Sequence, residues 1–312
     1  MAKRTLRDLP GQFAIDFENT GGSTPPAEEL SDDNRLFYLS FGSGSSGNSC
    51  YIGTRRGGVI IDAGVNDADV ERILAENSIP MSNVKAILLT HDHTDHIKYV
   101  YKLLRTNKNL RLYCTNRVLL GILRRHSISK RIKEFHNPIF KEIPFRVLDF
   151  EITAFEVPHD GSDNVGYSIS YNGVNFVLAT DLGAIPARAE YYMSRANYLV
   201  IEANYDLRML LNGSYPEHLK ARIQTERGHL DNEVTAAFLS RIYTPALRNV
   251  FLCHLSKDNN RPEIALSCVR SALEKRGVTV GDASSSVADR NSDIHICALP
   301  RFEGTPLFVF RT

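Results

Sequence analysis

The feature that most constrains this chain is a histidine cluster that directly follows an apolar run. "VKAILLT" occupies residues 84–90, and "HDHTDH" follows at residues 91–96. An apolar run of this length predicts a buried strand, so the cluster lies where that strand ends. Side chains alternate along an extended segment, so His91 and His93 project to the same side. Asp95 and His96, on the following turn, can approach the same point.

Three imidazoles and a carboxylate at one point predict a divalent metal site. Neutral imidazole and carboxylate are the usual ligands of zinc, and they also bind manganese or iron. No cysteine lies close to the cluster in the sequence, which argues against a structural zinc knot. The alternative is a polar surface turn, but the pattern HxHxDH after a buried strand is far more specific than a single histidine.

Six residues cannot complete two coordination spheres, so further ligands are expected at other strand ends. His159 closes "EITAFEVPH", Asp181 follows "VNFVLAT", and His254 follows "NVFLC". Each of the three, taken alone, could equally be a capping or buried hydrogen-bonded residue. Together they predict a dinuclear centre with Asp181 as the bridge, in which one ion is held by His91, His93 and His159 and the other by Asp95, His96 and His254.

The rest of the chain predicts two similar halves. A strand, turn and strand pattern begins at Leu36 and ends in Asp62-Ala63-Gly64, and a second series from Phe145 ends in Asp181-Leu182-Gly183. The second series contains Asn172-Gly173, a strong signal for a two-residue hairpin. This weak internal repeat predicts two sheets packed face to face with helices on their outer faces.

The ends and the cysteines bear on domain organisation and location. Residues 1–34 are rich in Gly, Pro and acidic residues and predict a loose or surface-wrapping extension, so one domain is expected over residues 35–312. The apolar runs are far shorter than the roughly 20 residues of a membrane span. Five cysteines without paired spacing favour the reducing cytoplasm over an oxidising compartment.

Charge is distributed unevenly along the chain. Between Lys98 and Lys133 there are eleven Lys and Arg residues and no Asp or Glu, although the net charge of the whole chain is only +1. Two interpretations remain open: helices with a solvated basic face, or a surface that binds phosphate groups.

The ordered motifs resemble those of the metallo-β-lactamase superfamily. The resemblance runs from about Leu36 to Pro262 and rests on Asp62 in "VIIDAG", the HDHTDH cluster, His159, Asp181 and His254, in that order. It implies an α/β fold, an αββα sandwich of two mixed β-sheets with helices outside and metals at one edge. In that superfamily the residue at the Asp62 position supports the metal loop.

Three further segments resemble the nuclease branch of the superfamily. "YLVIEANYD" contains Glu202, "RGHLDNEV" contains His229, and "CHLSKDNN" contains His254. Only about 25 residues separate Glu202 from His229, so the inserted β-CASP cap domain is absent. The chain is most similar to the YycJ (WalJ) group, marked by "SGSSGNS", "EANYD", "YPEHLKARI", "GHLDN" and "HLSKDNN". Asp231 departs from the expected Ser, and "SGSSGNS" by itself is also typical of a mobile hairpin.

This resemblance implies a dinuclear phosphodiesterase, specifically a 5′-to-3′ exonuclease on double-stranded DNA that uses a metal-bridged hydroxide. Asp95, Glu202 and His229 are the expected catalytic residues, with Glu202 orienting His229 as a hydrogen-bond or proton donor. Zinc is the first candidate for both ions and manganese the second. The alternatives are a lactonase- or thioesterase-type hydrolase, an RNA-processing nuclease, and a non-catalytic metal-binding scaffold. The sequence does not predict an oligomeric state.

Overall fold

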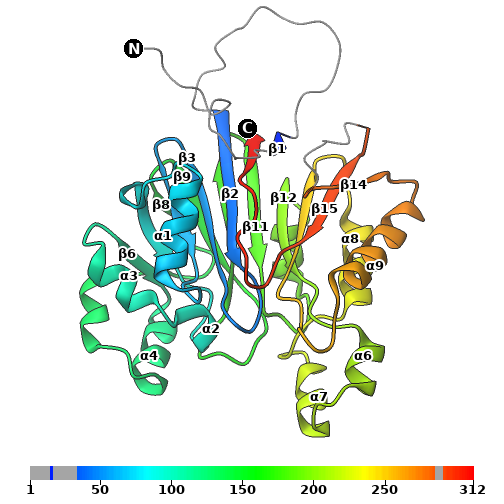
Figure 1. Cartoon of the computed structure of the whole chain (residues 1–312), viewed down its shortest axis with the longest axis horizontal. Coiled ribbons are helices and arrows are strands. Elements are labelled where there is room, and N and C mark those ends of the chain that lie inside the picture. The colour runs from blue at the N-terminus through cyan, green and yellow to red at the C-terminus, as the bar shows by residue number, and fades with distance from the viewer. Residues whose placement is uncertain (1–14, 17–33, 285–290) are drawn as a thin grey trace, which may run out of the picture.

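Two β-sheets lie face to face in the computed structural model, which describes residues 15–16, 34–284 and 291–312 (Figure 1). The first sheet contains, in spatial order, β1 (Ile15–Asp16), β16 (Phe308–Arg311), β2 (Arg35–Gly42), β3 (Ser49–Thr54), β4 (Gly57–Ile61), β5 (Val84–Leu88), β6 (Arg111–Cys114) and β7 (His136–Pro138). The second contains β14 (Val280–Asp282), β15 (Ile294–Ala298), β13 (Asn249–Cys253), β12 (Tyr198–Glu202), β11 (Val174–Ala179), β10 (Val165–Tyr171), β9 (Phe150–Glu156) and β8 (Phe145–Val147).

Each sheet combines antiparallel and parallel pairs. In the first sheet β2, β3 and β4 are antiparallel neighbours, and β4 to β7 run parallel. In the second sheet β9, β10 and β11 are antiparallel, and the strands from β11 through β12 and β13 to β15 run parallel. The prediction of two mixed sheets is confirmed.

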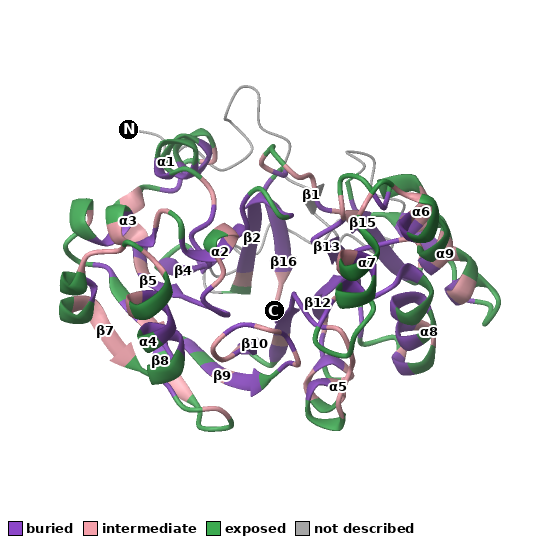
Figure 2. Cartoon of the chain, turned by 90° about the horizontal axis from the view of Figure 1, so that it is seen from below, coloured by how far each residue is buried: buried purple, intermediate pink, exposed green. Residues whose placement is uncertain are grey.

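Helices cover the outer face of each sheet. The first sheet packs against α1 (Asp67–Glu76), α3 (Val100–Thr106), α4 (Asn116–Arg125) and the 3-10 helix η4 (Lys130–Phe135). The second packs against α5 (Ala187–Met193), α8 (Asn232–Ile242) and α9 (Pro262–Glu274). The remaining helical segments are η3 (Met81–Asn83), α2 (Thr94–Ile97), α6 (Leu207–Asn212) and α7 (Glu217–Ile223). The order of layers is αββα, as the sequence predicts, and Figure 2 shows buried strands between helices with exposed outer faces.

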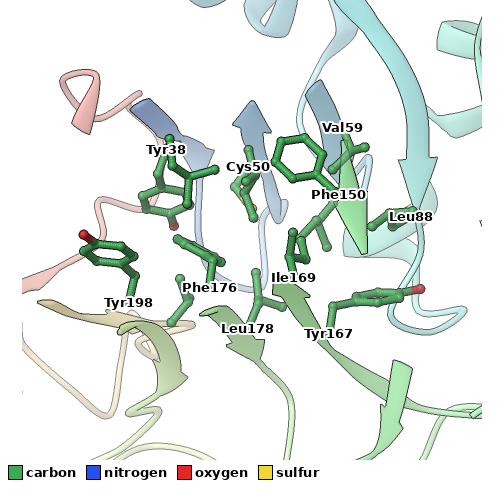
Figure 3. Close-up of a cluster of buried hydrophobic side chains, with 14 of the residues drawn as sticks. Tyr38, Cys50, Val59, Leu88, Phe150, Tyr167, Ile169, Phe176, Leu178 and Tyr198 are labelled. Atoms are coloured by element: carbon green, nitrogen blue, oxygen red, sulfur yellow. The ribbon is translucent and has the colours of Figure 1, made fainter. Parts of the chain in front are cut away.

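The two sheets share one apolar core. The ring of Tyr38 of β2 packs against the rings of Phe176 of β11 and Phe251 of β13, at centroid distances of 5.0 and 4.8 Å. Figure 3 shows Tyr38 and Phe176 in this core. Large apolar side chains buried in this way each stabilise the fold by about 1.5–3 kcal/mol. This core holds the two sheets together, so the strand ends at one edge keep fixed positions.

Both predicted turn signals have a physical basis in the structure. Asn172 and Gly173 connect β10 to β11 with φ values of 45° and 81°, the left-handed conformations that a tight hairpin requires. In the two Asp-x-Gly motifs the glycine allows close backbone contact. A Cβ at Gly64 would lie 1.6 Å from the carbonyl oxygen of Asp95, and one at Gly183 would lie 2.3 Å from that of Thr225.

Most of the predicted N-terminal extension lies outside the described residues. Of its described residues, Ile15 and Asp16 form β1, which pairs in parallel with β16. The division into an extension over 1–34 and a domain over 35–312 therefore stays a prediction. Within the described ranges, no helix is both long and apolar enough to cross a membrane. All five cysteines are free thiols.

Candidate metal centre

The carboxyl ends of strands from both sheets meet at one edge of the sandwich. The HDHTDH segment leaves β5 and enters α2, His159 follows β9, Asp181 follows β11, and His254 follows β13. In Figure 1 this is the lower edge, where α2 lies between α4 on one side and α6 and α7 on the other. The structure brings all seven predicted ligands together at this edge.

Three of the side chains at this edge leave their strands through a left-handed turn. Asp62, Asp181 and His254 have φ values of 59°, 54° and 54°. A residue other than glycine in this region costs about 1–3 kcal/mol and persists only where the surroundings hold it in place. Each turn directs a polar side chain across the sheet edge, toward the space between the two sheets' strand ends.

The first group of candidate ligands, called here the three-histidine cluster, consists of His91, His93 and His159. His159 Nδ1 donates to the carbonyl oxygen of Gly228 at 3.0 Å, so the lone pair of the neutral ring is on Nε2. That Nε2 lies 3.3 Å from His93 Nδ1. His91 Nε2 is buried and has no hydrogen-bond partner among the described residues. A cation between these nitrogens would satisfy all of them.

The second group, called here the carboxylate-rich cluster, consists of Asp95, His96 and His254. Asp95 Oδ2 lies 3.6 Å from His96 Nε2 and 3.5 Å from His254 Nε2. Asp181 lies between the two clusters. Its carboxylate is 3.2 Å from His96 Nε2, 3.4 Å from His254 Nε2 and 3.8 Å from His159 Nε2. It is the carboxylate placed to contact ions in both clusters.

The two clusters differ in protonation. Burial lowers the pKa of all three histidines in the three-histidine cluster, which favours the neutral, metal-binding form. Burial alone would also lower the pKa of His96. The negative charges of Asp62, Asp181 and Asp95 outweigh this effect and hold the pKa of His96 well above the usual range. For His254, Asp181, Asp95 and Glu202 outweigh burial and raise the pKa to about 10.

Asp62 supports the cluster from behind. Its Oδ2 lies 2.7 Å from His96 Nδ1, and its Oδ1 accepts from the backbone N–H of Thr90 at 2.9 Å. A carboxylate that holds one imidazole nitrogen fixes the ring so that the other nitrogen can bind a metal. Asp62 therefore has the supporting position that the sequence resemblance implies.

Glu202 and His229 lie beside the carboxylate-rich cluster. Glu202 is fully buried, and its Oε1 lies 2.8 Å from His229 Nδ1 and 3.1 Å from His254 Nδ1. Its Oε2 accepts from the backbone N–H groups of Leu182 and Leu230, both at 3.1 Å. Both oxygens are thus occupied, so Glu202 positions two histidines. The side chain of His229 is 17% exposed, more than that of His254 at 4%.

Asn48 and Asp160 are two site residues that sequence reasoning did not assign. The side-chain nitrogen of Asn48, in "SGSSGNS", lies 3.2 Å from Asp95 Oδ2 and 3.0 Å from His96 Nε2. Asn48 is buried, and Gly44 holds its amide on both sides, so this loop packs against the site and is not a free hairpin. The motif "SGSSGNS" was the sequence signal that could have identified Asn48. Asp160 had no signal beyond its place after His159.

The basic segment lies next to the same edge. Arg124, Arg125, Lys130 and Arg131 are exposed on α4 and η4. Arg125 lies 3.7 Å from the buried carboxylate of Asp92, the residue between His91 and His93. At Asp231, the residue that departs from the expected Ser, the side chain caps α8 by accepting from the N–H of Glu233 at 2.6 Å.

Comparison with known proteins agrees with this architecture. The β-lactamase superfamily domain model matches residues 58–254. Two solved structures share the fold, each with a TM-score of 0.61: the metallo-β-lactamase fold protein YhfI from Bacillus subtilis and Zn(2+)-bound PqqB from Methylobacterium extorquens. YhfI is 12% identical and covers 88% of this chain and 99% of its own, and PqqB is 16% identical and covers 86% and 99%.

Two curated relatives are much closer in sequence. Exodeoxyribonuclease YycJ of Bacillus anthracis is 32% identical over 249 residues, which are 80% of this chain and 93% of YycJ. Exodeoxyribonuclease WalJ of Streptococcus pneumoniae is 33% identical over 245 residues, which are 78% of this chain and 90% of WalJ. The family predicted from the sequence motifs is confirmed. This chain belongs to the β-lactamase superfamily, in the family of the YycJ and WalJ exodeoxyribonucleases.

Proposed function

We propose that this protein is a metal-dependent nuclease, specifically a 5′-to-3′ exonuclease on double-stranded DNA. The observation that carries the proposal is the Glu202–His229 pair beside two converging ligand clusters. Hydrolysis of a phosphodiester needs charge stabilisation at phosphorus and a donor for the leaving oxygen. Divalent ions held by the two clusters would supply the first requirement, and the pair would supply the second. The family relationship to exodeoxyribonucleases supports DNA as the substrate.

Two divalent ions, zinc before manganese, fit the donor atoms. His91, His93 and His159 would hold one ion, Asp95, His96 and His254 the other, with Asp181 shared between them. Imidazole and carboxylate donors suit both metals, and the unpartnered, buried His91 Nε2 is the kind of atom that a metal satisfies. When bound, the ions supply a water of lowered pKa at neutral pH and offset the negative charge of the phosphate.

The residues around the ions have separate roles in this proposal. Asp181 and Asp95 place negative charge between the imidazoles and keep the site selective for cations. Glu202 accepts from His229 Nδ1, so a protonated His229 presents its Nε2–H toward the reaction centre. That proton passes to the oxygen that leaves phosphorus, the role of a positioned proton donor.

The exposed basic surface of α4 and η4 is placed to hold the nucleic-acid backbone. It consists of Arg124, Arg125, Lys130 and Arg131, beside the edge that carries the ligands. Arg and Lys neutralise backbone phosphates and release counterions on binding. Small-molecule substrates gain nothing from such a surface.

We also propose a cytoplasmic location, because all five cysteines are free thiols. Two of them, Cys50 and Cys253, lie beside the site edge.

A substrate panel tests the proposal directly. Purified protein loaded with zinc or manganese is given end-labelled duplex DNA, single-stranded DNA, RNA, a lactone and a thioester. We expect release of nucleotides from the 5′ end of the duplex as the fastest reaction. Faster turnover of RNA would favour the RNA-processing alternative. Hydrolysis of the lactone or thioester with no cleavage of any nucleic acid would refute the nuclease assignment.

Charge reversal tests the DNA-binding surface separately. Changing Arg124, Arg125, Lys130 and Arg131 to Glu should weaken duplex binding and reduce its salt slope by about 0.9 for each phosphate that the surface no longer neutralises. Hydrolysis of a small chromogenic phosphodiester should change little. The matched control reverses four exposed basic residues elsewhere: Arg72, Arg146, Arg241 and Lys275. An equal fall in duplex affinity in both variants would mean that α4 and η4 form no specific surface.

A further inference from the structure

The segment between Glu202 and His229 is tied closely to the three-histidine cluster. In this segment α6 and α7 pack around a small core of their own, formed by Tyr205, Leu210 and Ile223. The chain then turns back into the site. Arg227 donates two hydrogen bonds to the carbonyl oxygen of His159, at 3.1 and 3.0 Å.

One ion pair extends this connection to a candidate ligand. Arg222 of α7 contacts Asp160 Oδ2 through Nε at 2.8 Å and through Nη2 at 2.6 Å. The other oxygen of Asp160, Oδ1, lies 3.3 Å from His93 Nε2 and 3.5 Å from His159 Nε2. It is buried and makes no hydrogen bond in the described part of the chain. An N–H group from one of the two imidazoles is therefore the available partner.

The hydrogen bonds decide which imidazole donates. His159 uses its Nδ1–H for the carbonyl oxygen of Gly228, which can only accept. In the neutral ring its Nε2 then carries no proton and cannot donate to Asp160. His93 remains, and a proton on His93 Nε2 leaves the lone pair on Nδ1. That lone pair faces His159 Nε2 at 3.3 Å, where two lone pairs converge on one point.

We propose that Asp160, held by Arg222, is a positioning residue that sets the tautomer and ring orientation of His93, so that α7 becomes part of the support of the first ion. An exposed ion pair alone contributes little to stability, and the side chain of Arg222 is 55% exposed. The role of this pair is therefore to orient a ligand. The inference rests on the proposed function, because it takes His93 as a ligand.

Metal affinity is the readout, measured for each ion by competition with a chromogenic chelator. Asp160→Ala should lower the affinity for the first ion by about 10- to 100-fold, the usual effect of removing the partner of a ligating histidine. The affinity for the second ion should be unchanged. Arg222→Ala should lower the affinity for the first ion to a smaller extent. Arg222→Lys should recover only part of the affinity, because an ammonium cannot make the two-point contact.

Arg72→Ala is the matched control, because Arg72 also pairs with carboxylates on an exposed helix but lies on α1, outside the site. Asp160→Asn keeps the shape of the side chain and carries the test if Asp160→Ala does not fold. Nitrogen-15 NMR of the wild-type imidazoles provides a check independent of any variant, since His93 should carry its proton on Nε2. A proton on Nδ1, or unchanged affinities in Asp160→Ala, would overturn the inference.

The same measurements separate this inference from the proposed function. Wild-type protein that binds two ions and degrades DNA, with Asp160→Ala indistinguishable from it, would remove only the role of Asp160. Wild-type protein that binds no divalent ion would remove the metal-dependent nuclease and the role of Asp160 together.

Discussion

The two ligand clusters lie side by side, but opposite electrostatic forces act on their histidines. In the three-histidine cluster burial dominates and the pKa values are lowered. In the carboxylate-rich cluster Asp62, Asp95, Asp181 and Glu202 outweigh burial, and the pKa values of His96 and His254 are raised. The first cluster is a neutral site ready for a cation. The second holds protons where a cation would bind, so a cation bound there would have to displace them.

The largest expected effect comes from Asp181, which both clusters share. Asp181→Ala should reduce bound metal to background and abolish turnover, because each cluster loses a ligand and the imidazoles lose the charge that offsets them. Elemental analysis of protein purified without chelator measures this, with Asp149→Ala as a control at an exposed carboxylate. Full occupancy of both ions in the Asp181 variant would exclude Asp181 from the centre.

His229→Ala should leave both clusters loaded. His229 contacts Glu202 through Nδ1 and is not one of the seven proposed ligands, so we expect two bound ions and a loss of about 10² or more in turnover. His254→Ala is the matched comparison, because the same carboxylate holds His254, and that variant should lose the second ion. The assignment is reversed if the His229 variant binds one ion fewer and the His254 variant keeps both.

Glu202→Gln should weaken metal binding in the carboxylate-rich cluster only. Glu202 holds both His254 and His229, so its loss should weaken the second ion by about 10- to 100-fold and leave the first ion unchanged. Turnover at saturating metal should also fall. The double variant with His229→Ala should be little slower than the slower single variant, since the two residues act as a unit. Additive losses in turnover would show that they act separately.

The last test separates the clusters by the pH dependence of metal binding, without any substitution. Because the pKa of His254 is raised to about 10, its imidazole is protonated at neutral pH without metal, and the ion competes with that proton. Affinity for the second ion should therefore rise with pH, about tenfold per pH unit for each proton displaced. The lowered pKa values in the three-histidine cluster predict a flatter profile for the first ion. Titrations between about pH 6 and about pH 8 test this, and equal slopes would contradict the comparison.

Much of the site could be predicted because it depends on patterns within short stretches of sequence. The alternation of side chains along a strand is enough to predict that His91 and His93, which follow an apolar run, project to the same side. The Asp-x-Gly motifs and Asn172-Gly173 likewise reflect local backbone requirements, and the structure confirms the strands and the hairpin. These signals survive in a single sequence because the backbone geometry that they require is short in range.

Other features depend on contacts between distant parts of the chain. Asn48 lies 47 residues from Asp95 in the sequence, and Arg222 lies 62 residues from Asp160. No periodicity links such pairs, so their roles could not be read from the sequence. The dual contact of Glu202 is similar, since its two histidines come from the start of α8 and the end of β13.

The sequence alone determined the layers, the strand ends and the identity of the candidate metal ligands. Periodicity and turn chemistry act within a few residues, and the order of motifs identified the family. Only the tertiary structure decided which nitrogen of each histidine is free and which histidines are held neutral. Those properties follow from burial and from carboxylates brought in by other strands, as at His254, where Glu202 and Asp181 come from two neighbouring strand ends.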